Sequence, residues 1–306
     1  MHLPIMVAEV LDRLRPVPGE VVVDCTLGGG GHARALLACL QPGGRLIGLD
    51  VDPLELPATA ARLAAAGFGP DTFVAHHRNF RDLAGVIAAE GLTGVDAILL
   101  DLGVSSMQHD TPARGFSYKH PGPLDLRMDP TRGDPASLHL ASLDEHAIAE
   151  LLAAHADEPH AARIARYLHE ARPQTTHALE RTVRLGLTAA VPALPKADVK
   201  MSVRRTFQAL RILVNDELAA LDDVLAALPA CLSPVGRVVV LTFHSGEDRR
   251  VKHAFRDGHR AGLYAAIADT VVRSGKDETF SNRRASSAKL RWAIRSHETR
   301  SQAGGS

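Results

Sequence analysis

The feature of this chain that most constrains its fold is a run of four glycines between a strand pattern and a helix pattern. The run lies in Asp24-Cys25-Thr26-Leu27-Gly28-Gly29-Gly30-Gly31-His32, which follows the valines 21–23 and precedes an alanine- and leucine-rich stretch over 33–40. Glycines let a backbone come close to a ligand, and the first turn of a helix offers unpaired N–H groups. The next strand pattern, 45–50, ends in Asp50, where a doubly wound fold binds ribose hydroxyls. The combination predicts a nucleoside cofactor, whereas the glycine run alone also fits a structural loop.

Strand and helix patterns alternate up to residue 101. We expect strands at 21–24, 45–50, 72–76 and 96–101, and helices at 32–40, 53–66 and 80–90. Such alternation predicts an α/β fold, with a doubly wound parallel sheet, right-handed crossovers and helices on both faces. A fifth strand is expected at 236–243, and the late runs 266–272 and 289–294 are expected to close the sheet as a hairpin.

The alternation stops after Asp101. Residues 102–135 show no clear periodicity, and loops longer than about 12–15 residues in compact domains are usually functional or disordered. Helical patterns follow at 143–155, 158–171 and 177–190, with Ser142 as the expected N-cap of the first, and a longer helix is expected over 203–228 with its apolar side on the sheet. We therefore expect a sheet domain in two parts, 1–106 and 202–298, a loop and helical insert over 107–201, and a flexible tail over 299–306.

Composition argues against several classes of protein. The hydrophobic content of 45% is that of a globular protein with a core, and no apolar run approaches the ~18 residues of a membrane span. The first ten residues lack the basic and apolar regions of a signal peptide. The cysteines Cys25, Cys39 and Cys231 form no Cys-x-x-Cys pair, and no Cys/His cluster is present, so we expect neither disulfides nor a bound metal. A reducing cytoplasm fits this cysteine usage best.

Charge is unevenly distributed along the chain, although the formal net charge is zero. Residues 1–195 contain 16 lysines and arginines against 23 acidic residues, a balance of −7, and residues 196–306 contain 19 against 12, a balance of +7. This asymmetry indicates that the C-terminal part faces a polyanion such as nucleic acid. A solvated surface is the alternative.

The expected fold leaves two cofactor classes open. A dehydrogenase would bind a nicotinamide dinucleotide, and a methyltransferase would bind S-adenosylmethionine in a similar cradle. Polar Asp24 and Thr26 before the glycines, Asp101 at the end of the fourth strand, and the antiparallel ending favour the methyltransferase. A non-enzymatic RNA-binding module is the rival from another class, and it would need the basic C-terminal part but neither the glycine cradle nor these acids.

Segments along almost the whole chain also carry a family resemblance. They are His2–Val10, Asp24–His32, Asp101–Ser106, Arg114–Ser117, Pro123–Pro130, Arg205–Arg211, Phe243–Ser245 and Ser286–Arg291. In these segments the chain resembles the ribosomal RNA small-subunit methyltransferase H family, also called MraW. The resemblance implies a Rossmann-like class I methyltransferase sheet interrupted by a helical insert, and S-adenosylmethionine as cofactor. It further implies methylation of the N4 amine of a cytidine in the decoding centre (P site) of 16S rRNA, within the small ribosomal subunit.

The resemblance also assigns cofactor positions, which fall on Gly30, Gly31, His32, Asp50, Phe80, Asp101 and Gln108. We expect the Asp50 carboxylate to accept hydrogen bonds from ribose hydroxyls and the flat Phe80 ring to cover the adenine, with packing at a helix start as the alternative for Phe80. Asp101 is the candidate catalytic residue, with the cofactor's ammonium, the target amine and the adenine site all open as its partner. The chain departs from the family at Met107, Gly246 and Ser286.

Seven further residues are candidates for contact with RNA, namely Asp125, Arg127, Arg204, Gln208, Arg211, His244 and Ser245. Six of them have a structural alternative. Asp125 and Arg127, together with Asp129, can form internal ion pairs that order the loop, and the residues at 204, 208, 211 and 215 can form a solvated helix face. Ser245 has capping-box-like spacing to Asp248.

Overall fold

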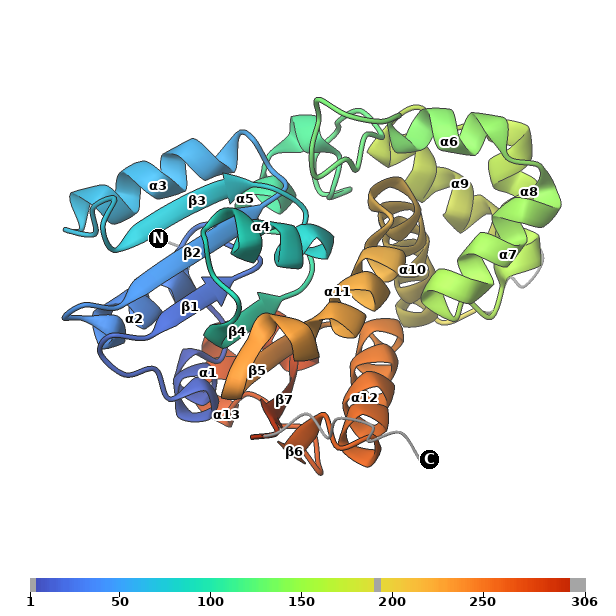
Figure 1. Cartoon of the computed structure of the whole chain (residues 1–306). Coiled ribbons are helices and arrows are strands. Elements are labelled where there is room, and N and C mark those ends of the chain that lie inside the picture. Colours follow the sequence, from blue (N-terminus) through green and yellow to red (C-terminus); the bar gives the residue numbers. More distant parts are fainter. Residues whose placement is uncertain (1–3, 190–193, 298–306) are drawn as a thin grey trace. The chain divides into compact units, whose positions relative to one another are not determined.

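The computed structural model describes residues 4–189 and 194–297, which form two compact units (Figure 1). The first unit comprises the described residues up to Gly103 and from Ala219 onward, and the second comprises Val104–Leu218. The expected tail over 299–306 lies outside the described residues.

The first unit contains a seven-stranded sheet of order β3-β2-β1-β4-β5-β7-β6. Its strands are β1 (Val21–Asp24), β2 (Arg45–Asp50), β3 (Phe73–His77), β4 (Val95–Asp101), β5 (Leu232–Thr242), β6 (Tyr264–Ile267) and β7 (Lys289–Arg295). The first five strands are parallel, and β7 pairs antiparallel with both β5 and β6. The doubly wound α/β sheet with an antiparallel ending is thereby confirmed. Of the run 266–272, only its start belongs to β6, and Val272 makes an isolated bridge to Leu290.

Both faces of this sheet are buried because its central strands are apolar on both sides. Along β4, Ile98 and Leu100 belong to one core, and Ala97 and Leu99 belong to the other, as the two-residue period of a strand requires. The first core is covered by α4 (Leu83–Ala89), α11 (Glu217–Cys231) and α12 (Ser245–Arg260), and the second by α1 (Val7–Leu14), α2 (Gly31–Leu40) and α3 (Glu55–Ala65). A short 3-10 helix, η1 (Phe80–Asp82), precedes α4, and α13 (Lys276–Ser281) and η3 (Arg283–Ser287) precede β7.

The second unit is helical and has a core of its own. It contains α5 (Ser106–Asp110), η2 (Pro112–Arg114), α6 (Ala136–Ser142), α7 (Glu145–Ala156), α8 (Ala161–Ala171), α9 (Thr176–Thr188) and α10 (Lys196–Asn215). Loop residues Phe116, Leu124 and Leu126 are buried in the same core, so the aperiodic stretch is packed rather than disordered. Asp144 caps α7 by accepting from the Ala147 N–H at 2.8 Å, so the expected cap at Ser142 was wrong by two positions.

The long helix expected over 203–228 is two helices. Asp216 has a left-handed conformation, φ 50°, which ends α10 before α11 begins. Val203, Phe207 and Leu210 of α10 are buried in the core of the second unit, whereas Leu221 of α11 packs on the sheet. The expectation that one apolar face runs from 203 onto the sheet was therefore wrong, because the chain turns at a residue that no periodicity marks. Helix α10 accordingly belongs to the second unit, whereas the sheet domain was expected to resume at 202.

Candidate functional site

Acidic side chains stand at the carboxyl ends of three adjacent strands of the first unit. Asp50 ends β2, Asp24 ends β1 and Asp101 ends β4. The chain leaves β1 toward β2 on one side, while β4 pairs with β1 on the other. This edge is the topological switch point at which open α/β sheets bind their ligands.

Asp50 fixes the glycine turn to the end of β2. Its Oδ2 accepts from the Gly28 N–H at 2.7 Å and its Oδ1 accepts from the Asp52 N–H at 2.8 Å. Burial is the main cause that raises the pKa of Asp50, against these backbone hydrogen bonds, which lower it. Each oxygen of a carboxylate can accept more than one hydrogen bond, so both retain capacity for a ligand hydroxyl.

The glycines of the turn differ in what an added side chain would contact. Gly30, with φ 76°, is the N-cap of α2, and a Cβ there would lie 2.8 Å from Cγ2 of Thr59. A Cβ on Gly31 would lie 2.8 Å from Cγ of Pro4. Both glycines thus permit close packing within the protein. A Cβ on Gly29 would meet no described atom within 4 Å, so this position, which the sequence analysis did not single out, leaves open space.

Behind the turn, His32 lies between two of the carboxylates. The ring is 6% exposed, and Nε2 lies 3.5 Å from Oδ2 of Asp101, an ion-pair distance that is long for a hydrogen bond. Burial lowers the pKa of His32, but the Asp101 carboxylate, followed by the charges of Asp24 and Glu278, outweighs burial and raises it. Oδ1 of Asp101 is buried and has no hydrogen-bond partner among the described residues.

Asp24 is the most deeply buried acid of this edge, with 1% of its surface exposed. Its Oδ1 accepts from the Thr26 N–H at 3.1 Å, and Oγ1 of Thr26 accepts from the Asp101 N–H at 2.7 Å. Burial raises the pKa of Asp24 to about 6, with His32 opposing the rise. One short segment after β1 therefore links the ends of β1 and β4.

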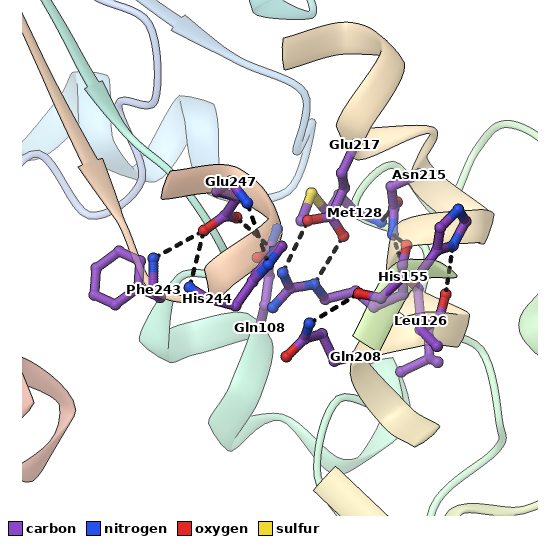
Figure 2. Close-up of polar contacts among 12 residues, drawn as sticks. Gln108, Leu126, Met128, His155, Gln208, Asn215, Glu217, Phe243, His244 and Glu247 are labelled. Carbon is purple, nitrogen blue, oxygen red and sulfur yellow. Dashed lines mark hydrogen bonds and ion pairs between the residues drawn. The ribbon is translucent and has the colours of Figure 1, made fainter. Parts of the chain in front are cut away.

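Helix α12 begins at the end of β5 with a cap that the sequence analysis placed one residue too late. His244 is the N-cap: its ring accepts from the Glu247 N–H at 3.4 Å, while Oε2 of Glu247 accepts from the N–H groups of Phe243 and His244 at 2.8 and 3.3 Å (Figure 2). Ser245 is the exposed first residue of the helix. Glu247, which the sequence analysis missed, stands three residues after the true cap, as in a capping box.

Two more expected cofactor residues have clear local roles. Phe80 opens η1 and is partly buried against the core that contains α4 and α11. Gln108 belongs to the second unit, where it forms a capping box with Ser105: Oε1 accepts from the Ser105 N–H at 2.9 Å, and the Gln108 N–H donates to Oγ at 3.1 Å.

The RNA candidates of the second unit are largely engaged in internal contacts. Arg127 donates to both carboxylate oxygens of Asp125 at 2.8 Å, so the ion-pair alternative describes this loop. Arg211 binds both carboxylate oxygens of Glu217 at 2.7 and 2.9 Å, a partner that the sequence analysis missed.

Helix α10 carries a stripe of four polar residues at intervals of four, three and four, Arg204, Gln208, Arg211 and Asn215, which we call the α10 stripe. Its members other than Arg211 divide between inward and outward roles. Gln208 donates to the His155 carbonyl at 3.1 Å, and Asn215 holds the loop by donating to the Leu126 carbonyl and accepting from the Met128 N–H, both at 2.7 Å (Figure 2). Arg204 is exposed. Of the three RNA candidates on α10, it is therefore the one whose side chain points to solvent.

Across residues 4–189 and 194–297, no group of three or more His, Cys, Asp or Glu side chains is arranged to hold a metal ion. No helix in these ranges is long and apolar enough to cross a membrane. Cys25 and Cys231 are buried and Cys39 is partly buried.

The strand order, the glycine turn into α2 and the acids at the switch point define a Rossmann-like class I methyltransferase fold. The family model described as the MraW methylase family matches residues 1–296. The chain belongs to this family, and the resemblance seen in the sequence is confirmed.

Curated relatives match this chain along most of their own length. A protein named ribosomal RNA small subunit methyltransferase H 1 from Lachnoclostridium phytofermentans is 42% identical over 300 residues, which cover 96% of this chain and 81% of that protein. Its namesake from Agathobacter rectalis is 42% identical over 307 residues, covering 96% and 85%. Ribosomal RNA small subunit methyltransferase H from Anaeromyxobacter sp. (strain Fw109-5) is 44% identical over 310 residues, covering 95% and 96%.

Proposed function

We propose that this chain is a 16S rRNA (cytosine-N4)-methyltransferase, which transfers the methyl group of S-adenosylmethionine to a cytidine in the decoding centre of the small subunit. Family membership supports the class of reaction, and the names of the relatives support the substrate. The observation within the molecule that carries the proposal is Asp101, which ends β4 at the switch point with a buried oxygen that no described residue satisfies. An rRNA substrate also favours the cytoplasm as the place of action.

The residues of this edge fit S-adenosylmethionine. Neither ring nitrogen of His32 has a hydrogen-bond partner among the described residues, and the same holds for Oδ1 of Asp101, so polar capacity remains at this edge. Asp24 and Asp101 are acids suited to a ligand that carries an ammonium and a sulfonium. Asp50 has acceptor capacity for ribose hydroxyls, and Gly29 leaves space beside the backbone.

The chemistry of the target amine defines what the protein contributes. The N4 lone pair of cytosine is delocalised into the ring, so the nitrogen is a poor nucleophile, and it needs acceptors for its protons. S-adenosylmethionine, when bound, supplies a methyl group activated by a sulfonium. We assign Asp101 to accept a hydrogen bond from the amine and to assist proton loss, and we assign His32 to hold Asp101 in place. Burial raises the pKa of the Cys25 thiol well above its usual range, which argues against a thiolate nucleophile at this edge.

The experiment that tests this function is methyl transfer with radiolabelled S-adenosylmethionine to small ribosomal subunits that lack the modification. We expect label in 16S rRNA and, after digestion, in N4-methylcytidine. Label in 5-methylcytidine, or in no nucleoside, would contradict the proposed chemistry. Binding of a nicotinamide dinucleotide in place of S-adenosylmethionine would support a dehydrogenase, and binding of RNA without either cofactor would support a non-enzymatic module.

A further inference from the structure

Helix α12 carries a row of basic side chains that the proposed chemistry does not use. Arg249, His253, Arg256 and Arg260 follow one another at intervals of four, three and four residues, and all four are exposed. At 3.6 residues per turn these intervals put them in one stripe, which extends about 16 Å along the helix. Lys252, which is half-buried, borders it. We call these five residues the α12 basic stripe.

Much of this positive charge is not neutralised within the chain. In the described part of the chain, the side chains of Lys252, His253 and Arg256 form no hydrogen bond or ion pair. The acidic residues of α12 contact groups outside the stripe or the last residue of the stripe. Asp257 pairs with Arg260, the last residue of the stripe.

The first two acids of α12 point away from the stripe. Glu247 is buried in the helix cap, and Asp248 holds Arg291 at 2.7 Å and Lys289 at 3.1 Å. Lys289 and Arg291 of β7 are therefore both engaged by Asp248, which makes them poorer candidates for RNA contact than the stripe.

The surroundings of the stripe favour a phosphate backbone over an acidic protein surface. Protein interfaces are built around an apolar centre, and none of the large apolar side chains found exposed on the described residues lies on α12. Beside the stripe, an open groove of about 430 Å³ is lined by Arg249 and His253 of α12 and by Leu225 and Pro229 of α11. Asp222 of α11 also lines it, and its carboxylate pairs with Arg250 at 3.1 Å. Such a groove suits a sugar or a base next to a phosphate.

We propose that the α12 basic stripe binds the phosphate backbone of the RNA that presents the target cytidine. This inference rests on the proposed function. Helix α12 begins directly after β5, and Leu241 of β5 pairs in register with Asp101 of β4. The stripe therefore starts at the same edge of the sheet as the candidate catalytic acid, and an RNA strand at that edge can follow it. Arginine forks bind phosphate oxygens in pairs, which gives the contacts direction as well as charge.

The test is a salt titration of RNA binding by the full chain carrying Lys252→Ala and Arg256→Ala, with deproteinised 16S rRNA and the small ribosomal subunit as separate probes. Loss of two phosphate contacts should weaken binding and reduce the slope of log affinity against log salt by about 1.4–1.8. The matched control removes two exposed cations elsewhere in the first unit, Arg34→Ala in α2 and Arg273→Ala in the loop before α13, and should leave the slope near wild type.

Three results would overturn the inference: an unchanged slope in the stripe variant, an equal loss in the control, or a loss seen with the subunit but not with deproteinised rRNA, which would indicate a protein partner. S-adenosylmethionine affinity should be unchanged in both variants, which also shows that they fold. The proposed function fails separately, when the wild-type chain transfers no methyl group to RNA.

Discussion

At the scale of single residues, the candidate site contains ionisable groups whose burial lowers the free energy of unfolding. Asp24 is buried at the end of β1 with a pKa raised to about 6, mainly by burial. Perturbed acids in a ligand-binding edge are characteristic of functional sites. A cationic ligand at this edge would favour the ionised carboxylate, and so would offset the cost.

Asp24→Asn should therefore stabilise the ligand-free chain at alkaline pH. Between the usual pKa of 3.8 and about 6, the folded state binds a proton that the unfolded state has lost, so stability falls as pH rises through this window. The cost at pH 8 is up to about 3 kcal/mol. Urea unfolding at pH 8 should show a gain for the variant that shrinks toward pH 4, and the exposed control Asp12→Asn should show none. A variant that is less stable than wild type at pH 8 would refute this account.

Asp101→Asn should leave the fold intact and slow methyl transfer. The amide keeps the size of the side chain, and the Asp101 N–H still donates to Thr26, but the acceptor for the amine proton loses its charge. A general base typically contributes 10²–10⁴-fold, so single-turnover rates at saturating cofactor and RNA should fall by roughly that factor. Asp71→Asn, an exposed acid outside this edge, is the control. A near-normal rate in the Asp101 variant would remove this residue from the mechanism.

At the scale of elements, sequence reasoning succeeded where a pattern ends in a chemically distinct residue. Strands β1, β2 and β4 were predicted closely because each apolar run ends in an acid at the sheet edge. It failed at the break between α10 and α11, because Asp216 turns the chain by a backbone angle that its residue type does not require. It also left open whether the arginines of α10 face solvent, since pairing with Glu217 depends on a contact across that break.

The two arginines of the α10 stripe should now behave differently. Arg211→Ala breaks a largely buried bidentate pair with Glu217 and should cost about 1.5–3 kcal/mol of stability. Arg204→Ala removes an exposed cation and should leave thermal unfolding unchanged, while lowering the RNA salt slope by about 0.7–0.9. Glu217→Gln, which changes the other member of the Arg211–Glu217 ion pair, is the matched control. Equal melting temperatures for the two arginine variants would show that the pair does not hold the helices together.

At the scale of the whole molecule, the two units differ in how the chain builds them. The second unit is one continuous segment with its own apolar core, whereas the sheet needs strands from both sides of it. A fragment of residues 104–218 should therefore unfold cooperatively on heating, as measured by circular dichroism. A fragment of residues 1–103 lacks β5 and β7 and should not. Cooperative melting of the second fragment, or none in the first, would contradict this division.

The position of β5 has a consequence for synthesis. The strand is inserted between β4 and β7, yet residues 102–231 separate it from β4 along the chain. A nascent chain therefore exposes the edge of β4 that β5 later covers throughout translation of the helical unit, and an open strand edge is a template for aggregation. Translation that pauses before residue 232 lengthens this exposure, so the yield of native protein depends on the speed at which the ribosome traverses a segment whose described residues are mainly helical.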